Sequence, residues 1–395
     1  MKSLSTAAEA VHASTTMAID AKAKQMKADG IDVVGFGAGE PDFNTPDNIN
    51  MAAIEAICQG KTKYTPAAGI IPLRKAAAAR LKADCGVDYD YTQIVVASGA
   101  KHVVYIALRA LTNPGDEIII PAPYWVSYGE MVRMTGGTPV EVLAGEDQGF
   151  KIRPEQLEKA ITGKTKCIIL NNPCNPSGAL YTRPELERIA RVCIAHDIYV
   201  ISDEIYYKLV YDGLEFVSFA ALGEEVKAHT ILINGVSKSY AMTGWRIGYA
   251  AADAHIAKVM ANYLSHSTGA PCTISQWAAA EGLNGPQEGI ETMRLAFEER
   301  RSYMYERINS IPGVSCIKPE GAFYIMMNIE KLIGRTLGGT VINSADDFAM
   351  AFLDKGLVAV VPCTGFGIPN FIRWSYATSM DNIREGLDRL EKFLA

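Results

Sequence analysis

The sequence predicts an α/β protein with a mostly parallel sheet in a large domain, followed by a smaller α+β domain. The first observation is that short apolar runs alternate with helical patterns in the middle of the chain, as expected for parallel strands covered on both faces. The second is that polar, turn-rich segments follow these runs. The third is the length of 395 residues, 49% of them hydrophobic, which is enough for two or three domains with a sizeable core.

Five short apolar runs in the middle of the chain are typical of buried strands. They cover residues 93–97, 117–120, 167–170, 198–202 and 230–233. A helical pattern over 101–111 follows the first run directly. A capping box formed by Thr182 and Glu185, with Pro184 at the first helical position, begins another helix. Apolar residues then follow at i, i+3, i+4 and i+7, which predicts an amphipathic helix.

The last part of the chain has a different pattern. A long charged helix is expected over 286–310, and the remaining elements are strands at 322–327, 358–361 and 371–376 with helices near 345–355 and 380–394. A strand-like segment at 33–36 precedes the large domain and is expected to pack with this part. We therefore divide the chain into an N-terminal arm with part of the small domain (1–45), a large domain (46–285) and a small C-terminal domain (286–395).

Composition argues against several classes of protein. The net charge of −6 is not that of a nucleic-acid-binding surface, and no segment approaches the ~18 consecutive apolar residues of a membrane helix. The eight cysteines contain no CxxC pair, so neither a zinc ribbon nor a thioredoxin-like site is expected, and we predict no metal site. The N-terminus lacks the apolar stretch of a signal peptide. We expect reduced thiols, a cytoplasmic location, and no nucleic-acid or membrane partner.

Four polar segments follow the predicted strands, at the edge where open parallel sheets bind ligands. They are Ser98–Lys101, Asn171–Gly178, Asp203–Tyr206 and Ser237–Lys238. Each has an ordinary structural explanation when taken alone: a tight turn, a proline-stiffened loop, a helix cap and a solvated lysine. Their occurrence together at one edge favours a single ligand site.

The chemistry of the four segments matches one cofactor. The backbone N–H groups at Gly99 and Ala100, at a helix start, suit a phosphate. Asn175 offers an amide donor, and Asp203 places a carboxylate at the end of a buried strand, where it should meet a cation. Lys238 can act as a nucleophilic amine if it is partly desolvated. This combination is the one expected for pyridoxal 5′-phosphate.

Over nearly its whole length the chain resembles the class I/II aminotransferases of pyridoxal-phosphate fold type I, in particular the bacterial aspartate aminotransferases. The motifs that carry the resemblance are AGEPDF (38–43), KYTPAAGI (63–70), SGAK (98–101), PYWVSY (123–128), NNPCNPSG (171–178), SDEIY (202–206), SKSYAMTGWRIGY (237–249), GAFY (321–324) and IRWSYA (372–377). The segment from Ser237 to Tyr249 is the most specific of these. The resemblance implies a seven-stranded type of sheet, an enzyme and a homodimer.

The resemblance also implies roles for single residues. Lys238 would be the catalytic residue, which binds the cofactor covalently and moves the proton between the substrate Cα and the cofactor. Asp203 would keep the pyridine nitrogen protonated, while Asn175 and Tyr206 would hydrogen-bond the 3′-oxygen. Trp125 would stack on the ring.

The remaining implied contacts concern the phosphate and the substrate. The phosphate would be held by Gly99, Ala100, Ser237 and Arg246, with Tyr64 reaching in from a second subunit. The substrate would be bound by Gly39, Lys101, Trp125, Asn175, Arg373 and Thr15. Among these, Arg373 would form a two-pronged pair with the α-carboxylate, and Lys101, assisted by Thr15, would bind the side-chain carboxylate. Considered without the resemblance, Arg373 could equally point outward from an edge strand.

The implied reaction is transfer of the amino group between L-aspartate and 2-oxoglutarate by a ping-pong mechanism. A transaminase for another amino acid and a pyridoxal-phosphate-dependent β-lyase remain open, because the cofactor motifs do not decide what happens at Cα. His12 stands where relatives that accept prephenate often have lysine, which argues against that substrate. A nicotinamide-dependent oxidoreductase is disfavoured because Gly35–Gly39 does not complete GxGxxG. A non-catalytic regulator would need a DNA-binding module for which the chain has no room.

Overall fold

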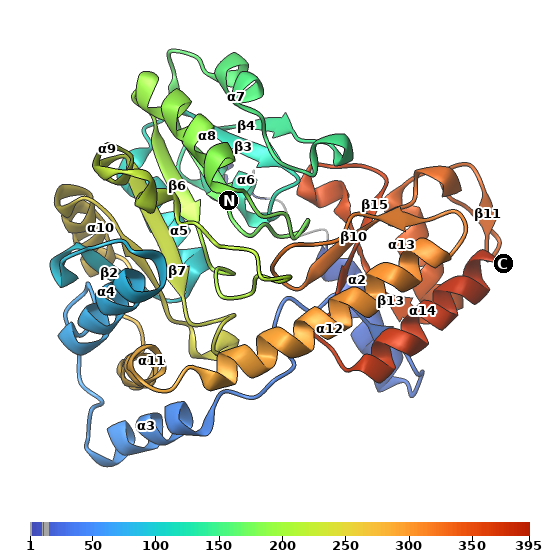
Figure 1. Cartoon of the computed structure of the whole chain (residues 1–395), viewed down its shortest axis with the longest axis horizontal. Helices are drawn as coiled ribbons and strands as arrows, with labels where there is room; N and C mark the ends of the chain where they lie inside the picture. The colour runs from blue at the N-terminus through green and yellow to red at the C-terminus, as the bar shows by residue number, and fades with distance from the viewer. Residues whose placement is uncertain (1, 10, 12–15) are drawn as a thin grey trace.

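The computed structural model describes residues 2–9, 11 and 16–395, and both the predicted site residue Thr15 and His12 lie outside them. Figure 1 shows a larger part built around a central sheet and a smaller part that contains the C-terminus. The N-terminal helix α2 (Thr16–Ala28) packs with the smaller part, beside α13 (Ala345–Gly356). Within the described residues, no helix is long and apolar enough to span a membrane.

The central sheet has seven strands in the order β2-β8-β7-β6-β5-β3-β4, which confirms the predicted α/β class. Along this order the strands are Ile94–Ala97, Gly248–Ala251, Thr230–Gly235, Tyr199–Asp203, Thr165–Asn171, Glu117–Ala122 and Thr138–Leu143. Strand β8 runs antiparallel to both of its neighbours, and the other neighbouring pairs are parallel. The carboxyl ends of β2, β5, β6 and β7 therefore meet at one edge, as the sequence predicts.

Two strands of this sheet were not predicted. Strand β4 lies at the edge and is half exposed, so it lacks a continuous apolar run, and it contains Pro139. Strand β8 has the sequence GYAA, whose small residues carry little strand preference. It is held in place by β2 on one side and β7 on the other, a tertiary effect that a local pattern cannot reveal.

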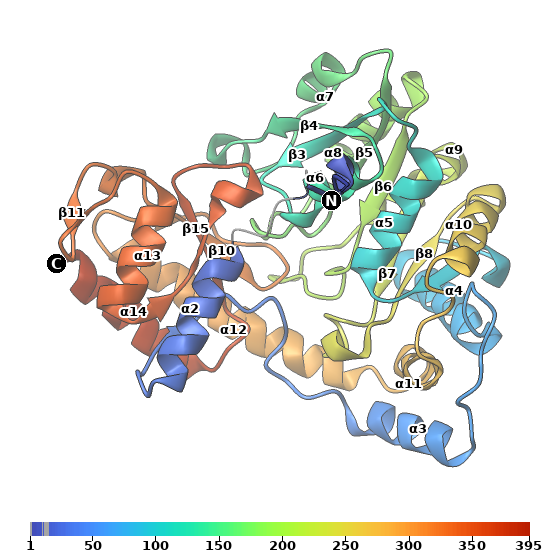
Figure 2. The ribbon, with the colours of Figure 1, turned by 180° about the vertical axis from the view of Figure 1, so that it is seen from behind.

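Helices cover both faces of the central sheet. They are α3 (Asp47–Cys58), α4 (Ile71–Cys85), α5 (Ala100–Leu111), α6 (Ser127–Met134), α7 (Pro154–Ala160), α8 (Arg183–Ala195), α9 (Glu224–Ala228), α10 (Ala254–His266) and α11 (Thr273–Asn284). Val95 on β2 packs toward α5 and α10, whereas its neighbours Ile94 and Val96 pack toward α4 and α11. Helix α8 lies before the sheet in Figure 1, and α5 lies before it in Figure 2.

Helix α8 begins one residue earlier than predicted, so Pro184 is its second residue rather than its first. The backbone N–H and the hydroxyl of Thr182 both donate to Oε2 of Glu185, at 2.7 and 2.9 Å. These two hydrogen bonds stabilise the N-terminus of α8. They therefore help to position the chain that follows the 171–178 loop.

The smaller part contains a four-stranded antiparallel sheet in the order β14-β15-β10-β9 and a two-stranded parallel pair, β1 with β13. The strands are β1 (Val34–Gly35), β9 (Ser315–Cys316), β10 (Tyr324–Asn328), β13 (Val358–Ala359), β14 (Val361–Pro362) and β15 (Phe371–Ser375), with β11 (Thr336–Leu337) and β12 (Thr340–Val341) as a separate pair. The single strand expected over 358–361 is divided, because β13 pairs with β1 and β14 pairs with β15. The domain limits proposed above stay a prediction.

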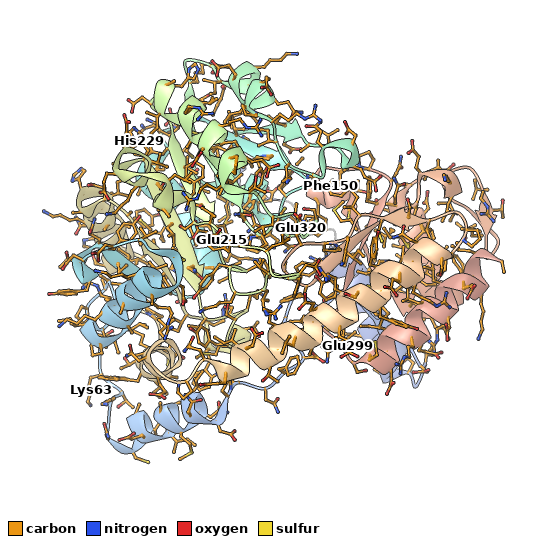
Figure 3. All side chains as sticks on the ribbon, in the orientation of Figure 1. Lys63, Phe150, Glu215, His229, Glu299 and Glu320 are labelled. Atoms are coloured by element: carbon orange, nitrogen blue, oxygen red, sulfur yellow. The ribbon has the colours of Figure 1, made fainter. Side chains whose placement is uncertain are left out.

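The remaining helices and short turns are distributed over both parts. They are α1 (Thr6–Glu9), α12 (Glu288–Ser310) and α14 (Met380–Leu394), with short 3-10 turns at Tyr91–Gln93, Glu146–Gln148, Phe219–Leu222, Thr243–Trp245, Glu330–Leu332 and Cys363–Phe366. The two parts touch where the loop bearing Glu320 meets the 171–178 loop (Figure 3). There the N–H groups of Glu320 and Gly321 both donate to the carbonyl of Gly178 at 2.9 Å. One part thus holds the other beside the polar edge of the central sheet.

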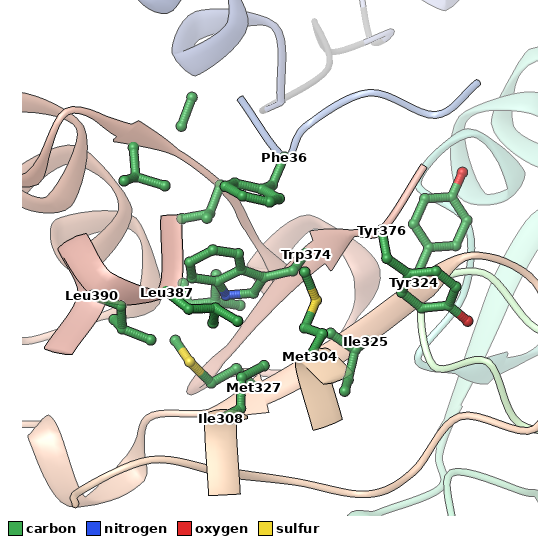
Figure 4. Close-up of a cluster of buried hydrophobic side chains, with 14 of the residues drawn as sticks. Phe36, Met304, Ile308, Tyr324, Ile325, Met327, Trp374, Tyr376, Leu387 and Leu390 are labelled. Atoms are coloured by element: carbon green, nitrogen blue, oxygen red, sulfur yellow. The ribbon is translucent and has the colours of Figure 1, made fainter. Parts of the chain in front are cut away.

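The core of the smaller part is centred on Trp374, which is fully buried (Figure 4). Its ring lies 4.7 Å from that of Phe36, centroid to centroid, and the cluster around it includes Met304, Ile308 and Leu387. This packing joins the N-terminal segment, α12, α14 and β15 into one unit. It therefore fixes the position of Arg373, which precedes Trp374 on β15.

Replacing Leu387 by alanine should lower the free energy of unfolding by about 2–5 kcal/mol, because it leaves a cavity in a close-packed core. Leu387 is fully buried, whereas Leu295 on α12 is 53% exposed. Leu295→Ala is therefore the matched control and should change stability by less than about 0.5 kcal/mol. Urea denaturation followed by tryptophan fluorescence measures both changes. Equal losses in the two variants would contradict the packing described here.

Candidate active site

A cavity of about 340 Å³ lies at the polar edge of the central sheet, where the smaller part faces it. The predicted site residues that line it are Gly39, Ala100, Lys101, Trp125, Asn175, Asp203, Tyr206, Ser237, Lys238, Arg246 and Arg373. Segments that are up to 334 residues apart in the chain thus converge on one space. Of the other predicted residues, Gly99 lies just behind the cavity wall, Tyr64 lies elsewhere on the surface, and Thr15 is outside the described residues.

Lys238 follows β7 by three residues and is half-buried. Its Nζ donates to the carbonyl of Gly39. Burial lowers the pKa of the Lys238 amine from its ordinary 10.5 to about 8, assisted by the charges of Arg246 and Arg373 and opposed by those of Glu40 and Asp203. Near neutral pH a larger share of this amine is therefore unprotonated than for an exposed lysine. An unprotonated amine is the form that attacks carbonyl carbon.

Asp203 ends β6 and is buried. Its Oδ1 accepts a hydrogen bond from the N–H of Ile205 at 3.2 Å, and its Oδ2 accepts one from the hydroxyl of Tyr128 at 2.6 Å. Burial raises the pKa of the Asp203 carboxyl, while these two hydrogen bonds and the charge of Lys238 oppose the rise. A carboxylate held in this way is suited to pair with a cationic group that enters the cavity.

Tyr128 was missed as a site residue, although it stands in the PYWVSY motif. It is fully buried on α6 and lines the cavity. It follows Trp125 by three positions, so that both side chains can face the same space, and their rings meet edge to face at 5.4 Å. That spacing of two aromatic residues was the signal in the sequence.

The turn between β2 and α5 can hold an anion. Gly99 caps α5 with a φ of +87°, a conformation that favours glycine. A Cβ atom at this position would overlap the guanidinium group of Arg246. Arg246 is fixed there by hydrogen bonds to the carbonyls of Thr243 at 2.7 Å and Ser98 at 3.4 Å. A cation thus stands beside the free N–H groups of a helix start, which is an arrangement suited to phosphate.

Arg373 lies on β15 and is only 6% exposed, so the possibility that it points outward is wrong. Its Nη1 donates to Oδ1 of Asn175 at 3.1 Å and its Nη2 to the carbonyl of Gly37 at 2.9 Å. The guanidinium lies 4.4 Å from the ring centroid of Tyr324, and its Nε is buried with no hydrogen-bond partner among the described residues. A buried guanidinium with an unused donor is suited to a carboxylate.

Tyr206 and Tyr324 form a second pair of aromatic residues in the cavity wall. Their hydroxyl oxygens lie 3.0 Å apart, and burial raises the pKa of both. Tyr324 was also missed, although it ends the GAFY motif. It comes from the smaller part, whereas Tyr206 follows Asp203 on the larger one, so the pair crosses the boundary between the two parts.

Lys101 lies where this cavity meets a neighbouring one of about 600 Å³, and it lines both. Its Nζ is 4.9 Å from the ring centroid of Trp125. Burial, assisted by the charge of Arg246, lowers the pKa of the Lys101 amine. Lys101 adds to the basic side chains of Lys238, Arg246 and Arg373 that also line this cavity, which suits a ligand with two carboxylates.

Tyr64 does not belong to the site of its own chain, because its side chain is fully exposed on the loop between α3 and α4. Its role in a second subunit stays a prediction.

The residues that do line the cavity fit pyridoxal phosphate. The α5 turn and Arg246 match the phosphate, Asp203 the ring nitrogen, and Lys238 the aldehyde.

Comparison with known proteins gives consistent results. Residues 31–390 match the family model for aminotransferase class I and II. The chain is 52% identical to the aspartate aminotransferase of Bacillus sp. (strain YM-2), over 96% of each chain. It is 48% identical to the aspartate/prephenate aminotransferase of Cereibacter sphaeroides, over 98% of this chain and 97% of that one. It is similar to the crystal structure of the Thermus thermophilus aspartate aminotransferase with maleate, with a TM-score of 0.93, 40% identity and full coverage of both chains.

Proposed function

The chain belongs to the class I and II aminotransferases and is therefore an aminotransferase, and we propose which substrates it uses. It transfers the amino group between L-aspartate and 2-oxoglutarate, with pyridoxal phosphate as cofactor. The observation that carries the proposal is the convergence of Lys238, Asp203 and Arg373 on one cavity that is also lined by Lys101. The relative with maleate supports a dicarboxylic substrate, because maleate carries two carboxylates.

When bound, pyridoxal phosphate supplies an aldehyde that bonds to amines and a ring that accepts electrons from Cα. Asp203 would face the ring nitrogen and keep it protonated through its charge. The N–H group of Ala100, the hydroxyl of Ser237 and the guanidinium of Arg246 would hold the phosphate. Trp125 would lie against the ring, and Asn175 and Tyr206 would donate to its oxygen.

Lys238 would carry out the proton transfers. Its amine would first bond the cofactor, then be displaced by the amino group of aspartate, and then accept the proton from Cα. It would deliver that proton to the cofactor side, and water would then supply the keto oxygen, so that oxaloacetate leaves in the first half-reaction while the amino group stays with the cofactor. The same groups would act in reverse on 2-oxoglutarate, giving L-glutamate. This order of release before the second substrate binds is a ping-pong mechanism.

Arg373 and Lys101 would orient the substrate from opposite ends. Arg373 would bind the α-carboxylate next to the Gly39 backbone, and Lys101 the side-chain carboxylate, with Thr15 as a further contact from the N-terminal segment. A homodimer is proposed as the active form, with Tyr64 of each subunit reaching the phosphate in the other. Its full exposure is consistent with such a contact.

Replacing Lys101 by alanine should reduce kcat/KM for aspartate by about 10–100-fold, because a charge-assisted hydrogen bond to the side-chain carboxylate is lost. Activity with alanine, which lacks that carboxylate, should fall by less than about threefold. The measurement is a screen of amino donors and 2-oxo acids with both enzymes. Lys82→Ala, in an exposed ion pair with Asp88, is the control.

The same screen tests the proposed substrate. A wild-type enzyme that transaminates alanine or aromatic amino acids far faster than aspartate would refute the specificity while sparing the reaction type. Release of ammonia and pyruvate from a cysteine conjugate would instead indicate a β-lyase. Prephenate belongs in the screen because several relatives are named for it, and His12 predicts that it is a poor substrate.

A further inference from the structure

The loop that bears Tyr64 is hydrogen-bonded to the first turn of α11. The hydroxyl of Thr273 donates to the carbonyl of Lys63 at 2.9 Å, and Nε2 of Gln276 donates to the hydroxyl of Thr65 at 3.2 Å. Both residues that flank Tyr64 are therefore held from the same helix. Figure 3 shows Lys63 at the periphery of the larger part, far from the smaller one.

Gln276 makes further bonds that fix the end of the loop. It is fully buried, its Oε1 accepts from the N–H of Ile70 at 2.8 Å, and its Nε2 also donates to the carbonyl of Pro271 at 2.8 Å. The start of the loop is held by Lys61, whose Nζ lies 3.6 Å from the ring centroid of Trp277. Positions 273, 276 and 277 are spaced i, i+3 and i+4, so they share one face of α11.

Although these contacts hold the backbone of the loop, the Tyr64 side chain does not line the cavity of its own chain and is fully exposed. Exposed loops are ordinarily mobile, and ordering one costs conformational entropy. If Tyr64 must insert into another surface, it is useful to hold the backbone on both sides of it in advance. The conformational entropy of the loop is then already lost in the free chain and does not weaken the association. A surface groove of about 780 Å³ beside the loop, lined in part by Tyr64 and Thr273, leaves room for a partner there.

We propose that Thr273 and Gln276 are positioning residues that hold the Tyr64 loop in the conformation needed to complete the cofactor phosphate site of the second subunit. This inference rests on the proposed homodimer and on the proposed role of Tyr64. It goes beyond them by assigning a role in cofactor retention to residues that line neither site. The effect of losing them should therefore be found in the partner's site and not in the site of the same chain.

The first test uses matched homodimers. Thr273→Val removes the hydroxyl at nearly constant shape, and the dissociation constant for pyridoxal phosphate should rise about fivefold, whereas Thr273→Ser should keep the wild-type value. Gln276→Leu removes several hydrogen bonds and should raise the constant by more than about tenfold. The constant is measured from the change in tryptophan fluorescence when the cofactor is added to apoenzyme, and the recovery of activity in the same titration is the second readout. Equal values for the valine, serine and wild-type enzymes would overturn the proposal, as would equal weakening by valine and serine.

The second test uses heterodimers that carry Lys238→Ala in one chain and Thr273→Val or Gln276→Leu in the other. The only Lys238 then lies in the chain with the altered loop support, and its site is completed by an intact Tyr64 loop from the other chain. Cofactor affinity at that site should return to the wild-type value. If the affinity stays as weak as in the Thr273→Val or Gln276→Leu homodimer, the residues act within their own chain and the inference is wrong.

A third heterodimer separates this inference from the proposed function. It pairs Lys238→Ala with Tyr64→Phe, and it too should regain wild-type affinity. If it does not, Tyr64 does not act across subunits and that part of the proposed function fails. If it does while the loop-support heterodimers do not, the proposed function stands and only the positioning role of Thr273 and Gln276 is refuted.

Discussion

Replacing Lys238 by alanine should reduce kcat for aspartate transamination by at least about 10³-fold. The change removes both the amine that bonds the cofactor and the group that moves the Cα proton, and a positioned acid–base group alone is worth about 10²–10⁴-fold. Steady-state kinetics at saturating cofactor measures the loss. Lys82→Ala, on an exposed lysine, should leave kcat unchanged.

A measurement of stability distinguishes this loss from misfolding. Burial lowers the pKa of the Lys238 amine to about 8 in the folded apoprotein, whereas the unfolded chain keeps the ordinary 10.5. Below about pH 8 the charged amine therefore disfavours folding, and this penalty disappears as the pH rises toward 10.5. At pH 7 the alanine variant should be at least as stable as the wild-type apoprotein. An unfolded variant, or a folded one that keeps full activity, would contradict the role assigned to Lys238.

Replacing Asp203 by asparagine should reduce kcat by about 10²–10³-fold, because a neutral amide cannot hold a buried cationic ring nitrogen, and removing one partner of a buried pair costs about 3–5 kcal/mol. Asparagine keeps the size of the side chain, and its single amide oxygen can replace one of the two carboxylate oxygens that accept from Tyr128 and from the N–H of Ile205. Kinetics at saturating cofactor and the absorbance spectrum of the bound cofactor are the measurements.

Glu204→Gln is the matched control for Asp203. Glu204 is also a buried carboxyl, but its Oε1 accepts from Ser202 and Ser218 at 2.9 Å and from the N–H of Phe219, on the other side of the strand end from the cavity. Its replacement should leave the cofactor spectrum as in the wild type, with any change confined to stability. Loss of the spectrum in Glu204→Gln together with its retention in Asp203→Asn would reverse the assignment made here.

Much of the architecture was predictable because it depends on local patterns. The buried runs that became β2, β3, β5, β6 and β7 are continuous and apolar, and polar residues follow them at the edge where parallel strands end. This is why the amino-acid sequence alone places Lys238 and Asp203 in one site.

The features that were missed depend on contacts between distant segments. Strand β8 exists because β2 and β7 flank it, and residues 358–361 form two strands because two different partners pair with them. Tyr128 and Tyr324 belong to the cavity through their bonds to Asp203 and Tyr206, which lie 75 and 118 residues away along the chain. The burial of Arg373 is likewise a property of how the smaller part packs against the larger one.

The most direct test of the proposed function is whether Nζ of Lys238 forms a covalent bond with pyridoxal phosphate. The measurement is borohydride reduction of the holoenzyme followed by peptide mass mapping. We expect the reduced cofactor to be recovered on the peptide that contains residue 238. Recovery of that peptide without the added mass, from enzyme that was active before reduction, would contradict it.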